Sequence, residues 1–465
     1  MAQGAIPVEL GTKPIRKLLT QYAVPGIIAM TASSLYNMVD SIYIGHIRDV
    51  GSLAISGLGV TFPLMNISSA LGTLVGVGAA TMISVLLGQK NYESANKVLA
   101  NEVTLNIIIG LLFTVFVLLF IDPILVFFGA SENTLPFARD YMRIIATGNV
   151  VTHLYFGLNS VIRSSGNPKT AMGLTLFTVG ANAVLDPIFI FALDLGVKGA
   201  ALATVICQLM SLCYTLWFFL DQKKFLHLPR KHMLRVDWKI AKDSLEIGMG
   251  PFLMNLASCI VVLFINRQLL HWGGDLAIGA YGIVNRICFL FVMIVMGFNQ
   301  GMQPIAGYNY GARQYSRVRE VYIRTCVAAT IVCCAGFIIS EVFPSLAVSA
   351  FTNDPSLKTL ATRGLREMNI VFPIIGFQMV TTNLFQCLGM VSKSIFLSLS
   401  RQLLFLLPCI YILPGILQSE SGVWLSFPIS DFIASVITAL FAVSLIRKLG
   451  SLGDGDSPEI LGSKI

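Results

Sequence analysis

Charged residues are scarce in this sequence of 465 residues. Asp, Glu, Lys and Arg make up 12% of it, hydrophobic residues make up 55%, and the mean hydropathy is +0.76. Soluble domains carry about 25% charged residues, so the composition excludes a water-soluble fold. Long polar stretches are missing too. A dozen helices of roughly 20 apolar residues, with short connections, account for nearly the whole chain, which leaves no room for a catalytic domain outside a membrane.

Motifs of nucleotide and metal chemistry are absent as well. The sequence has no P-loop, no H-E-x-x-H, no nucleophile elbow and no EF-hand pattern. Its nine cysteines show neither C-x-x-C nor Cys/His ligand spacing, which predicts free thiols and no metal site. We therefore expect no enzyme activity and no cofactor, and an ion gradient as the energy source of any transport.

The apolar runs predict an all-α membrane protein with twelve spans. Bounded by charged residues, Gly and Pro, the spans lie at about 16–45, 52–87, 94–120, 136–162, 168–192, 198–220, 240–268, 276–306, 315–342, 359–388, 393–415 and 421–447. Most Lys and Arg residues then fall on one side, as in cytoplasmic segments. This bias explains the net charge of +8 without a nucleic-acid partner. We expect a monomer in the lipid bilayer of a bacterial cytoplasmic (inner) membrane, with both termini cytoplasmic.

The two halves of the chain repeat each other. An offset of 223 residues places LAISGLGV from Leu53 on LAIGAYGI from Leu276, and Gly88 on Gly311, without a gap. The repeat predicts two pseudo-symmetric six-helix lobes of the same orientation, an arrangement that suits rocking around a central cavity. The predicted domains are a first lobe at 1–222, a cytoplasmic linker at 223–239, a second lobe at 240–448 and a disordered cytoplasmic tail at 449–465.

Charged side chains inside spans are costly, so the few that occur are candidate functional groups. In the first lobe these are Asp40 in the first span and Asp186 in the fifth, at similar predicted depth. Tyr36 precedes Asp40 by one helical turn, and Asn182 precedes Asp186 in the same way. A carboxylate in a low dielectric can titrate near neutrality, which makes the two acids a candidate proton site. The alternative is that they only satisfy buried backbone groups or a buried partner.

Two further residues belong with these acids. Thr204 in the sixth span is a polar residue that shares a helix face with Gln208, one turn later. Pro25 precedes Asp40 on the same span and removes a hydrogen bond of the helix, so it is a candidate bending point. The second lobe is poorer in charges, and the pattern assigns no role to those that lie in or near its spans: Glu246, Arg286 and Asp431.

Several segments together resemble the multidrug and toxic compound extrusion (MATE) family, in its DinF- and MepA-like branch. They include VDSIYIGHI from Val39, LDPIFIF from Leu185, QPIAGYNYGA from Gln303 and GVWLSFPISD from Gly422. The resemblance covers about residues 14–448 and implies twelve helices in two lobes around a central cavity. It also implies the efflux of cationic or amphipathic compounds in exchange for protons or sodium.

The resemblance carries over to single residues. Asp40 and Pro25 match the acid and the proline of the family's first helix. The polar cluster of the family's first lobe corresponds to Tyr36, Asn182, Asp186 and Thr204, with Asn159 as a further candidate. Acids that some sodium-coupled members carry in helices 7 and 10 have no counterpart in this sequence, which places the expected coupling site in the first lobe.

The leading hypothesis is a cation-coupled multidrug efflux antiporter that works by alternating access, with protons as the coupling ion. Its expected partners are small cationic or amphipathic compounds and the lipid bilayer. Three alternatives stay open: a sodium-coupled antiporter, a flippase for a lipid-linked precursor, and a receptor or scaffold that transports nothing. A basic cavity lining would favour the flippase hypothesis. A scaffold would not require acids at matched depth.

Overall fold

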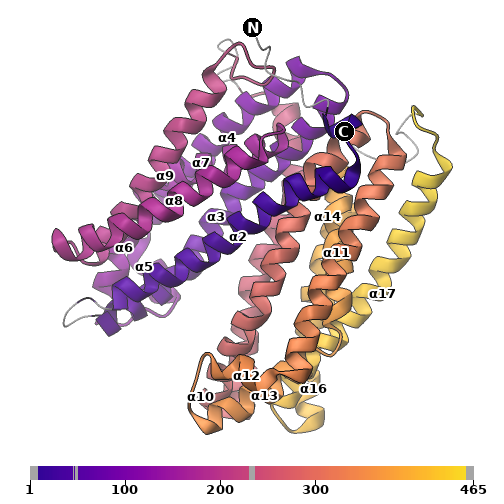
Figure 1. Cartoon of the computed structure of the whole chain (residues 1–465). Coiled ribbons are helices and arrows are strands. Elements are labelled where there is room, and N and C mark those ends of the chain that lie inside the picture. Colours follow the sequence, from indigo (N-terminus) through magenta and orange to yellow (C-terminus); the bar gives the residue numbers. More distant parts are fainter. Residues whose placement is uncertain (1–8, 46, 48–50, 230–235, 457–465) are drawn as a thin grey trace. The chain divides into compact units, whose positions relative to one another are not determined.

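The computed structural model describes residues 9–456, apart from 46, 48–50 and 230–235; the side chains of 36–42, 45, 51–53 and 55 also lie outside the described part. Within these limits the chain is helical and contains no strand (Figure 1). The first half contains α1 (Glu9–Thr12), α2 (Ile15–Gly45), α3 (Gly51–Gly88), α4 (Tyr92–Leu119), α5 (Ile121–Phe127), α6 (Leu135–Thr147), α7 (Asn149–Ser164), α8 (Pro168–Pro187), the π-helical turn η1 (Ile188–Ala192) and α9 (Val197–Leu220).

The second half contains α10 (Trp238–Gly311), α11 (Tyr315–Val342), α12 (Pro344–Ser349), α13 (Pro355–Met368), α14 (Phe372–Cys387), α15 (Val391–Leu399), the π-helical turn η2 (Ser400–Leu406), α16 (Leu407–Leu417) and α17 (Ser421–Ser451). Nine helical segments of the described residues are long and apolar enough to cross a membrane. One of them, α10, breaks at Gly274, whose φ of 66° is not helical, so it supplies two spans. The pair α13 and α14, bent by 56°, supplies one more. Helices α6 and α7 lie at the corresponding place in the first half, where the fourth of the twelve spans is predicted.

The repeat predicted from the sequence recurs in the backbone. Helix α11 begins and ends 223 residues after α4, and α14 begins and ends 223 residues after α7. Lys90 and Arg313, one offset apart, have φ values of 60° and 56°. Gly166 and Gly389 share a positive φ in the same way, at 95° and 68°. The halves therefore repeat their turns as well as their helices.

Two helices contribute to both compact units of the chain. One unit contains Ile28–Phe252, and the other contains Gly11–Ile27 together with the residues from Leu253 onward. Helix α2 is thus divided two residues after Pro25, and α10 is divided one residue after Pro251. A proline lacks the N–H that would bond to the preceding turn, so each division falls where the helix is weakened. The predicted lobes, 1–222 and 240–448, did not anticipate this exchange of segments.

The exchanged segments pack at glycines that occupy equivalent places in the two halves. In the second unit, a Cβ at Gly301 of α10 would lie 2.6 Å from the backbone nitrogen of Ala23 on α2. In the first unit, a Cβ at Gly78 of α3 would collide with the carbonyl of Ser244 on α10. Small residues let helix backbones approach closely. The two glycines explain why the first turns of α2 and α10 pack where they do.

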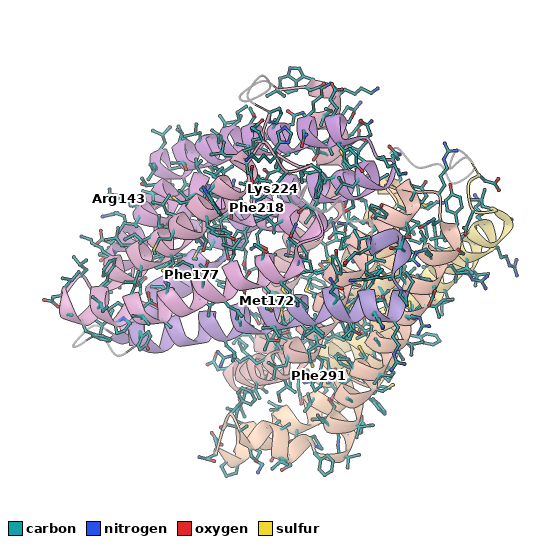
Figure 2. All side chains as sticks on the ribbon, turned by 45° about the horizontal axis from the view of Figure 1, so that its top comes forward. Arg143, Met172, Phe177, Phe218, Lys224 and Phe291 are labelled. Atoms are coloured by element: carbon teal, nitrogen blue, oxygen red, sulfur yellow. The ribbon has the colours of Figure 1, made fainter. Side chains whose placement is uncertain are left out.

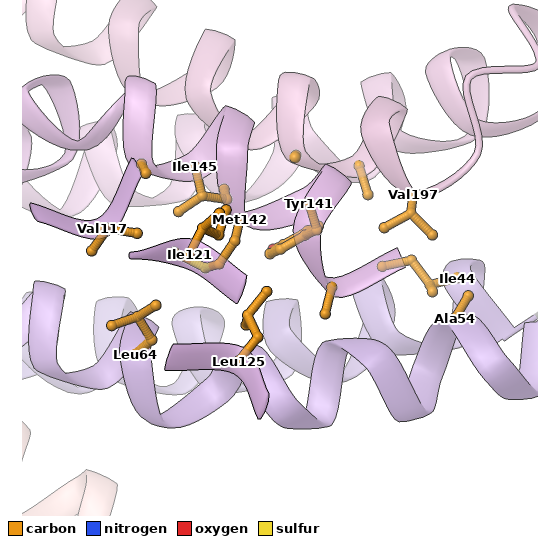
Figure 3. Close-up of a cluster of buried hydrophobic side chains, with 14 of the residues drawn as sticks. Ile44, Ala54, Leu64, Val117, Ile121, Leu125, Tyr141, Met142, Ile145 and Val197 are labelled. Carbon is orange, nitrogen blue, oxygen red and sulfur yellow. The ribbon is translucent and has the colours of Figure 1, made fainter. Parts of the chain in front are cut away.

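The core of the first unit is apolar. Side chains of α3, α5, α6 and α9 meet there and are almost completely buried, with Leu64, Leu125, Tyr141 and Val197 as representatives (Figure 3). Burying a large apolar side chain contributes about 1.5–3 kcal/mol relative to leaving it in water. The cluster therefore holds the short helix α5 against its longer neighbours.

The described parts of the predicted linker are docked on α4. The amide of Asn101 donates to the carbonyl of Asp237 (2.8 Å), and Asn96 accepts from the N–H of His227 (2.9 Å). Lys224 folds back on the end of α9, with its Nζ 3.3 Å from the centre of the Phe218 ring (Figure 2). Burial lowers the pKa of Lys224, and the carboxylate of Asp221 partly offsets this. The linker is therefore held against the first unit on both sides of residues 230–235.

The tail departs from its predicted disorder where it is described. Helix α17 continues to Ser451, and Asp454 accepts hydrogen bonds from the N–H and the hydroxyl of Ser316 (3.0 and 2.7 Å). In the first half, Asn91 caps α4 by accepting from Ser94, whereas its equivalent Gln314 makes no side-chain cap of α11. Asp454 supplies the missing acceptor. The composition could not show this contact, and residues 457–465 lie outside the described part.

The glycine contact in the second unit gives a first prediction. Gly301→Ala should lower the thermal stability of the purified protein by about 1–3 kcal/mol, because the added methyl group overpacks the contact with α2. Gly282→Ala is the matched control, since nothing lies within 4 Å of a Cβ there, and it should stabilise slightly through helix propensity. Equal melting temperatures for the two variants would show that the contact with α2 does not limit stability.

The tail contact gives a second prediction. The N–H and hydroxyl of Ser316 hold the pKa of Asp454 below its ordinary value. The charged carboxylate therefore stabilises the contact at pH values above its ordinary pKa of about 3.9. This stabilisation is lost as the pH falls through the lowered pKa of the folded protein. The protection factors for hydrogen exchange at the first turn of α11, which are corrected for the intrinsic pH dependence of exchange, should therefore fall in acid, and Asp454→Ala should lower them at neutral pH. The first turn of α4, capped by the amide of Asn91, is the internal reference; a parallel change there would contradict the prediction.

Candidate functional site

The end of α8 places two of the predicted site residues. Pro187 ends the regular helix and is followed by the π-helical turn η1, as expected from its missing N–H. Asn182 and Asp186 lie on the last turns before this point and are buried, with exposed fractions of 1% and 0%. A carboxyl group at such a position has little access to bulk water, so its charge depends on the groups around it.

Helix α9 supplies the partner of this pair. The amide of Asn182 donates to Oγ1 of Thr204 at 3.4 Å, and Thr204 in turn donates to the carbonyl of Ala200 at 3.1 Å. Asn182 and Thr204 thus join α8 to α9, and Asp186 is buried one turn after Asn182 on α8. Their shared role in one site stays a prediction.

The polar contacts continue along α9. Thr152 of α7 donates to Oε1 of Gln208 at 2.6 Å, and Thr178 of α8 shares a hydrogen bond of 2.6 Å with Ser211. Spacings of three and four residues put such groups on one face of a helix. We call this set the α9 polar face: Thr204, Gln208, Ser211 and Thr215. It offers hydroxyl and amide groups to a ligand, and no charge.

The side chains of two predicted site residues lie outside the described part of the structure. Tyr36 and Asp40 lie on α2, but their side chains are outside the described residues. Pro25 lies inside the same helix, which continues on both sides of it. The roles of these three residues stay predictions.

Asn159 forms hydrogen bonds within α7 and to α8. Its amide donates to the carbonyl of Ala171 at 3.2 Å, and its oxygen accepts from Arg163 at 3.4 Å. At 1.5 Å per residue, Ala171 is about 16 Å along α8 from Asn182. The bond to Ala171 ties Asn159 to the first half of α8, and the membership of Asn159 in the polar cluster stays a prediction.

The second half contains a buried ion pair that the sequence did not reveal. Nε of Arg401 donates to Asp431 at 2.6 Å, and the Asp431 side chain is only 4% exposed. Gln402 donates to Oγ of Ser258 at 2.7 Å beside it. Arg401 lies in η2, inside the span formed by α15 and α16. No residue pattern marks a π-helical turn, so the pairing was not predictable.

A second acid is buried in the first half. Glu102 lies on α4, within the predicted span 94–120, and is 1% exposed. The inference that Asp40 and Asp186 are the charges of the first-lobe spans is therefore incomplete. The position of Glu102, well inside an apolar run, was the signal that could have identified it.

Comparisons with known proteins agree with this architecture. The family model MatE matches residues 25–188 and 247–412, once in each half. The multidrug export protein MepA of Staphylococcus aureus (strain N315) is 27% identical over 448 residues, which is 96% of this chain and 97% of that protein. A crystal structure of MATE in the straight conformation has a TM-score of 0.89 and 25% identity, covering 97% of this chain and 100% of that one. A crystal structure of MATE in the bent conformation has a TM-score of 0.90 and 24% identity, covering 96% of this chain and 99% of that one.

The ion pair of the second half gives a third prediction. Arg401→Gln should cost about 3–5 kcal/mol of stability, because it leaves the carboxylate of Asp431 buried without a counter-charge. The double variant with Asp431→Asn should recover much of this loss, since both groups are then neutral and can still hydrogen-bond. Thermal unfolding of the purified variants measures both changes. A double variant no more stable than Arg401→Gln would contradict the assignment of an isolated charge pair.

Proposed function

Because the chain belongs to the MatE family, we propose that it is a multidrug efflux antiporter that exchanges cationic or amphipathic compounds for protons by alternating access. It is a multi-pass membrane transporter and not an enzyme. The observation that carries the proposal is the burial of Asp186 beside the Asn182–Thr204 hydrogen bond. A buried carboxyl group is a suitable exchange site for a cation, because its binding energy changes strongly with its own protonation.

In the proposed cycle, Asp40 and Asp186 take up protons from outside the cell. Neutralising the acids weakens the attraction for a bound cationic compound, which is then released. A ligand shifts a conformational equilibrium only by its different affinity for the two states. Tyr36 and Asn182 contribute by donating to the charged carboxylates, so that protonation also changes these hydrogen bonds, while Thr204 holds Asn182 in place. Asn159 is left out, because its bonds tie α7 to the start of α8.

Bending of α2 at Pro25 is the proposed conformational step. The support is that the compact units divide α2 two residues after Pro25, and α10 one residue after Pro251. If α2 or α10 changed its bend angle at these points, the number of its residues that pack in each unit would change. The proline removes a backbone hydrogen bond there, so bending costs less than elsewhere in the helix.

The remaining features of the proposal follow from the same topology. With both termini in the cytoplasm, the tail contact at Ser316 and the linker lie on the cytoplasmic side. The coupling ion needs no further cofactor, and the transporter acts as a monomer in the bilayer. Sodium could occupy the same oxygens as the proton, so the experiment below includes it as an outcome.

The fourth prediction tests the location of coupling. Asp186→Asn should abolish proton-driven accumulation of fluorescent cationic dyes in inverted membrane vesicles, because an amide cannot bind and release a proton. One proton moving through 100 mV supplies about 2.3 kcal/mol, a concentration ratio of roughly 50, and the variant should lose the dye gradient that this energy maintains.

Asp140→Asn is the control, because Asp140 forms an exposed ion pair with Lys198 at 3.3 Å and should be dispensable. Full activity of Asp186→Asn would refute the proposed site. Accumulation driven by a sodium gradient and not by a pH gradient would show that the coupling ion is sodium.

A further inference from the structure

A second buried polar site lies where α3, α4 and α7 pack together in the first unit. Glu102 of α4 is 1% exposed, and its Oε1 accepts a hydrogen bond of 2.7 Å from the amide of Asn106. Among the described residues, neither Oε2 of Glu102 nor Oδ1 of Asn106 has a hydrogen-bond partner. Two acceptors without a donor are costly in a dry interior. One more hydrogen between them would remove the deficit.

A glycine on α7 makes the room for this carboxyl group. A Cβ at Gly157 would collide with Oε1 of Glu102 and would lie 2.5 Å from Nδ2 of Asn106. Gly76 of α3 faces Gly157, because a Cβ there would lie 2.5 Å from the Cα of Gly157. The carboxyl group is therefore enclosed by the backbones of neighbouring helices.

Polar residues continue from this point along α7. His153, one turn before Gly157, is completely buried, and its Nε2 lies 3.3 Å from Oγ of Ser68 and 3.2 Å from Nδ2 of Asn149. Ser68 also donates to Asn149. Nδ1 of His153 has no hydrogen-bond partner in the described part. We call this set the buried polar column: Ser68, Glu102, Asn106, Asn149 and His153.

The second unit shows what the same helices look like without the column. Offset by 223 residues, the acid becomes Thr325, which donates to a carbonyl of its own helix, and the glycine becomes Val380. Ser68 and Asn149 become Phe291 and Phe372, whose rings meet edge to face at 6.3 Å. Both versions form the same helices with the same boundaries. Packing therefore does not require the acid, and its presence in one half calls for another explanation.

No counter-charge faces Glu102 within the described residues. Helix α3 carries no titratable side chain, and on α7 the titratable groups are His153, Tyr155 and Arg163. On α4 itself, Glu93 and Lys97 pair with each other at 2.7 Å. The remaining charged groups on neighbouring elements are Asp122 on α5, Arg139, Asp140 and Arg143 on α6, and Lys239, Lys242, Asp243 and Glu246 at the start of α10. An ionised Glu102 would thus depend on one amide donor.

We propose that Glu102 is a proton-binding site of the first lobe, distinct from the Asp40–Asp186 pair. The carboxyl group carries its proton on Oε2, where the O–H supplies the donor that this atom and Oδ1 of Asn106 lack. Losing the proton would leave a charge against the backbone of Gly157, so protonation is linked to the close contact of α4 with α7. The proposal does not depend on the transport function, because it concerns the state of one carboxyl group in the folded protein.

Infrared spectroscopy of the full-length protein in lipid nanodiscs tests the proposal. At neutral pH the spectrum should contain a C=O stretching band of a protonated carboxylic acid that disappears in Glu102→Gln. Asn106→Leu should shift this band and not remove it, because the acid loses its amide partner and remains buried. The double variant Glu102→Thr with Gly157→Val copies the second unit and should also lack the band. It provides a second folded reference if Glu102→Gln does not fold.

Two results would overturn the proposal. The first is the absence of any difference between the wild-type and Glu102→Gln spectra in the carboxylic acid region from about pH 5 to 8, which would show that Glu102 is ionised. The second is conversion of the band to carboxylate bands by added sodium, which would show a sodium site. A persistent band in a protein that exports no drug would uphold the proton site and contradict the proposed function, so the two failures are distinguishable.

Discussion

Polar side chains within the spans must find their hydrogen-bond partners inside the protein, because the surrounding lipid offers none. The rest of the structure depends on this constraint. It pairs Asn182 with Thr204 and Thr178 with Ser211, and so fixes how α8 lies against α9. It also pairs Arg401 with Asp431 in the second half. Each contact sets a helix register that apolar packing alone leaves open, since an apolar face has no directional preference.

The two halves pack equivalent helices with different side chains at the contacts. Helices α4 and α7 recur as α11 and α14 with the same boundaries at an offset of 223 residues, and so do the left-handed turns at Lys90 and Arg313. The first half places acids and amides between these helices, whereas the second half places Phe291 against Phe372 and neutralises Asp431 with Arg401. The shared backbone provides two similar units. The polar substitutions make the first unit the one suited to bind a cation.

Much of the fold could be predicted from the sequence. The scarcity of charge indicated spans throughout the chain, and glycines in register revealed the repeat and its offset. The i, i+4 spacing of Asn182 and Asp186 correctly placed both on one face of α8. These signals are local, since each depends on a few residues whose spacing or hydropathy has one structural meaning.

The features that escaped prediction depend on contacts between distant segments. A continuous helix gives no sign of which unit its first turns join, so the exchange at Pro25 was not foreseen. Glu102 was missed because the run 94–120 is apolar as a whole. The π-helical turn that directs Arg401 toward Asp431 has no residue signature. The contact of Asn159 with Ala171 was not foreseen, because spacing along α7 does not tell which part of α8 it meets.

The central claim is that the first half binds the coupling proton and that the second half does not. The most direct measurement is calorimetry of drug binding to the purified protein in two buffers of different ionisation enthalpy, which gives the number of protons released per bound drug. The account predicts that Asp186→Asn lowers this number, while the double neutral variant Arg401→Gln, Asp431→Asn leaves it unchanged. Release from Asp186→Asn equal to that of the wild-type protein, or its loss in the double variant alone, would contradict the account.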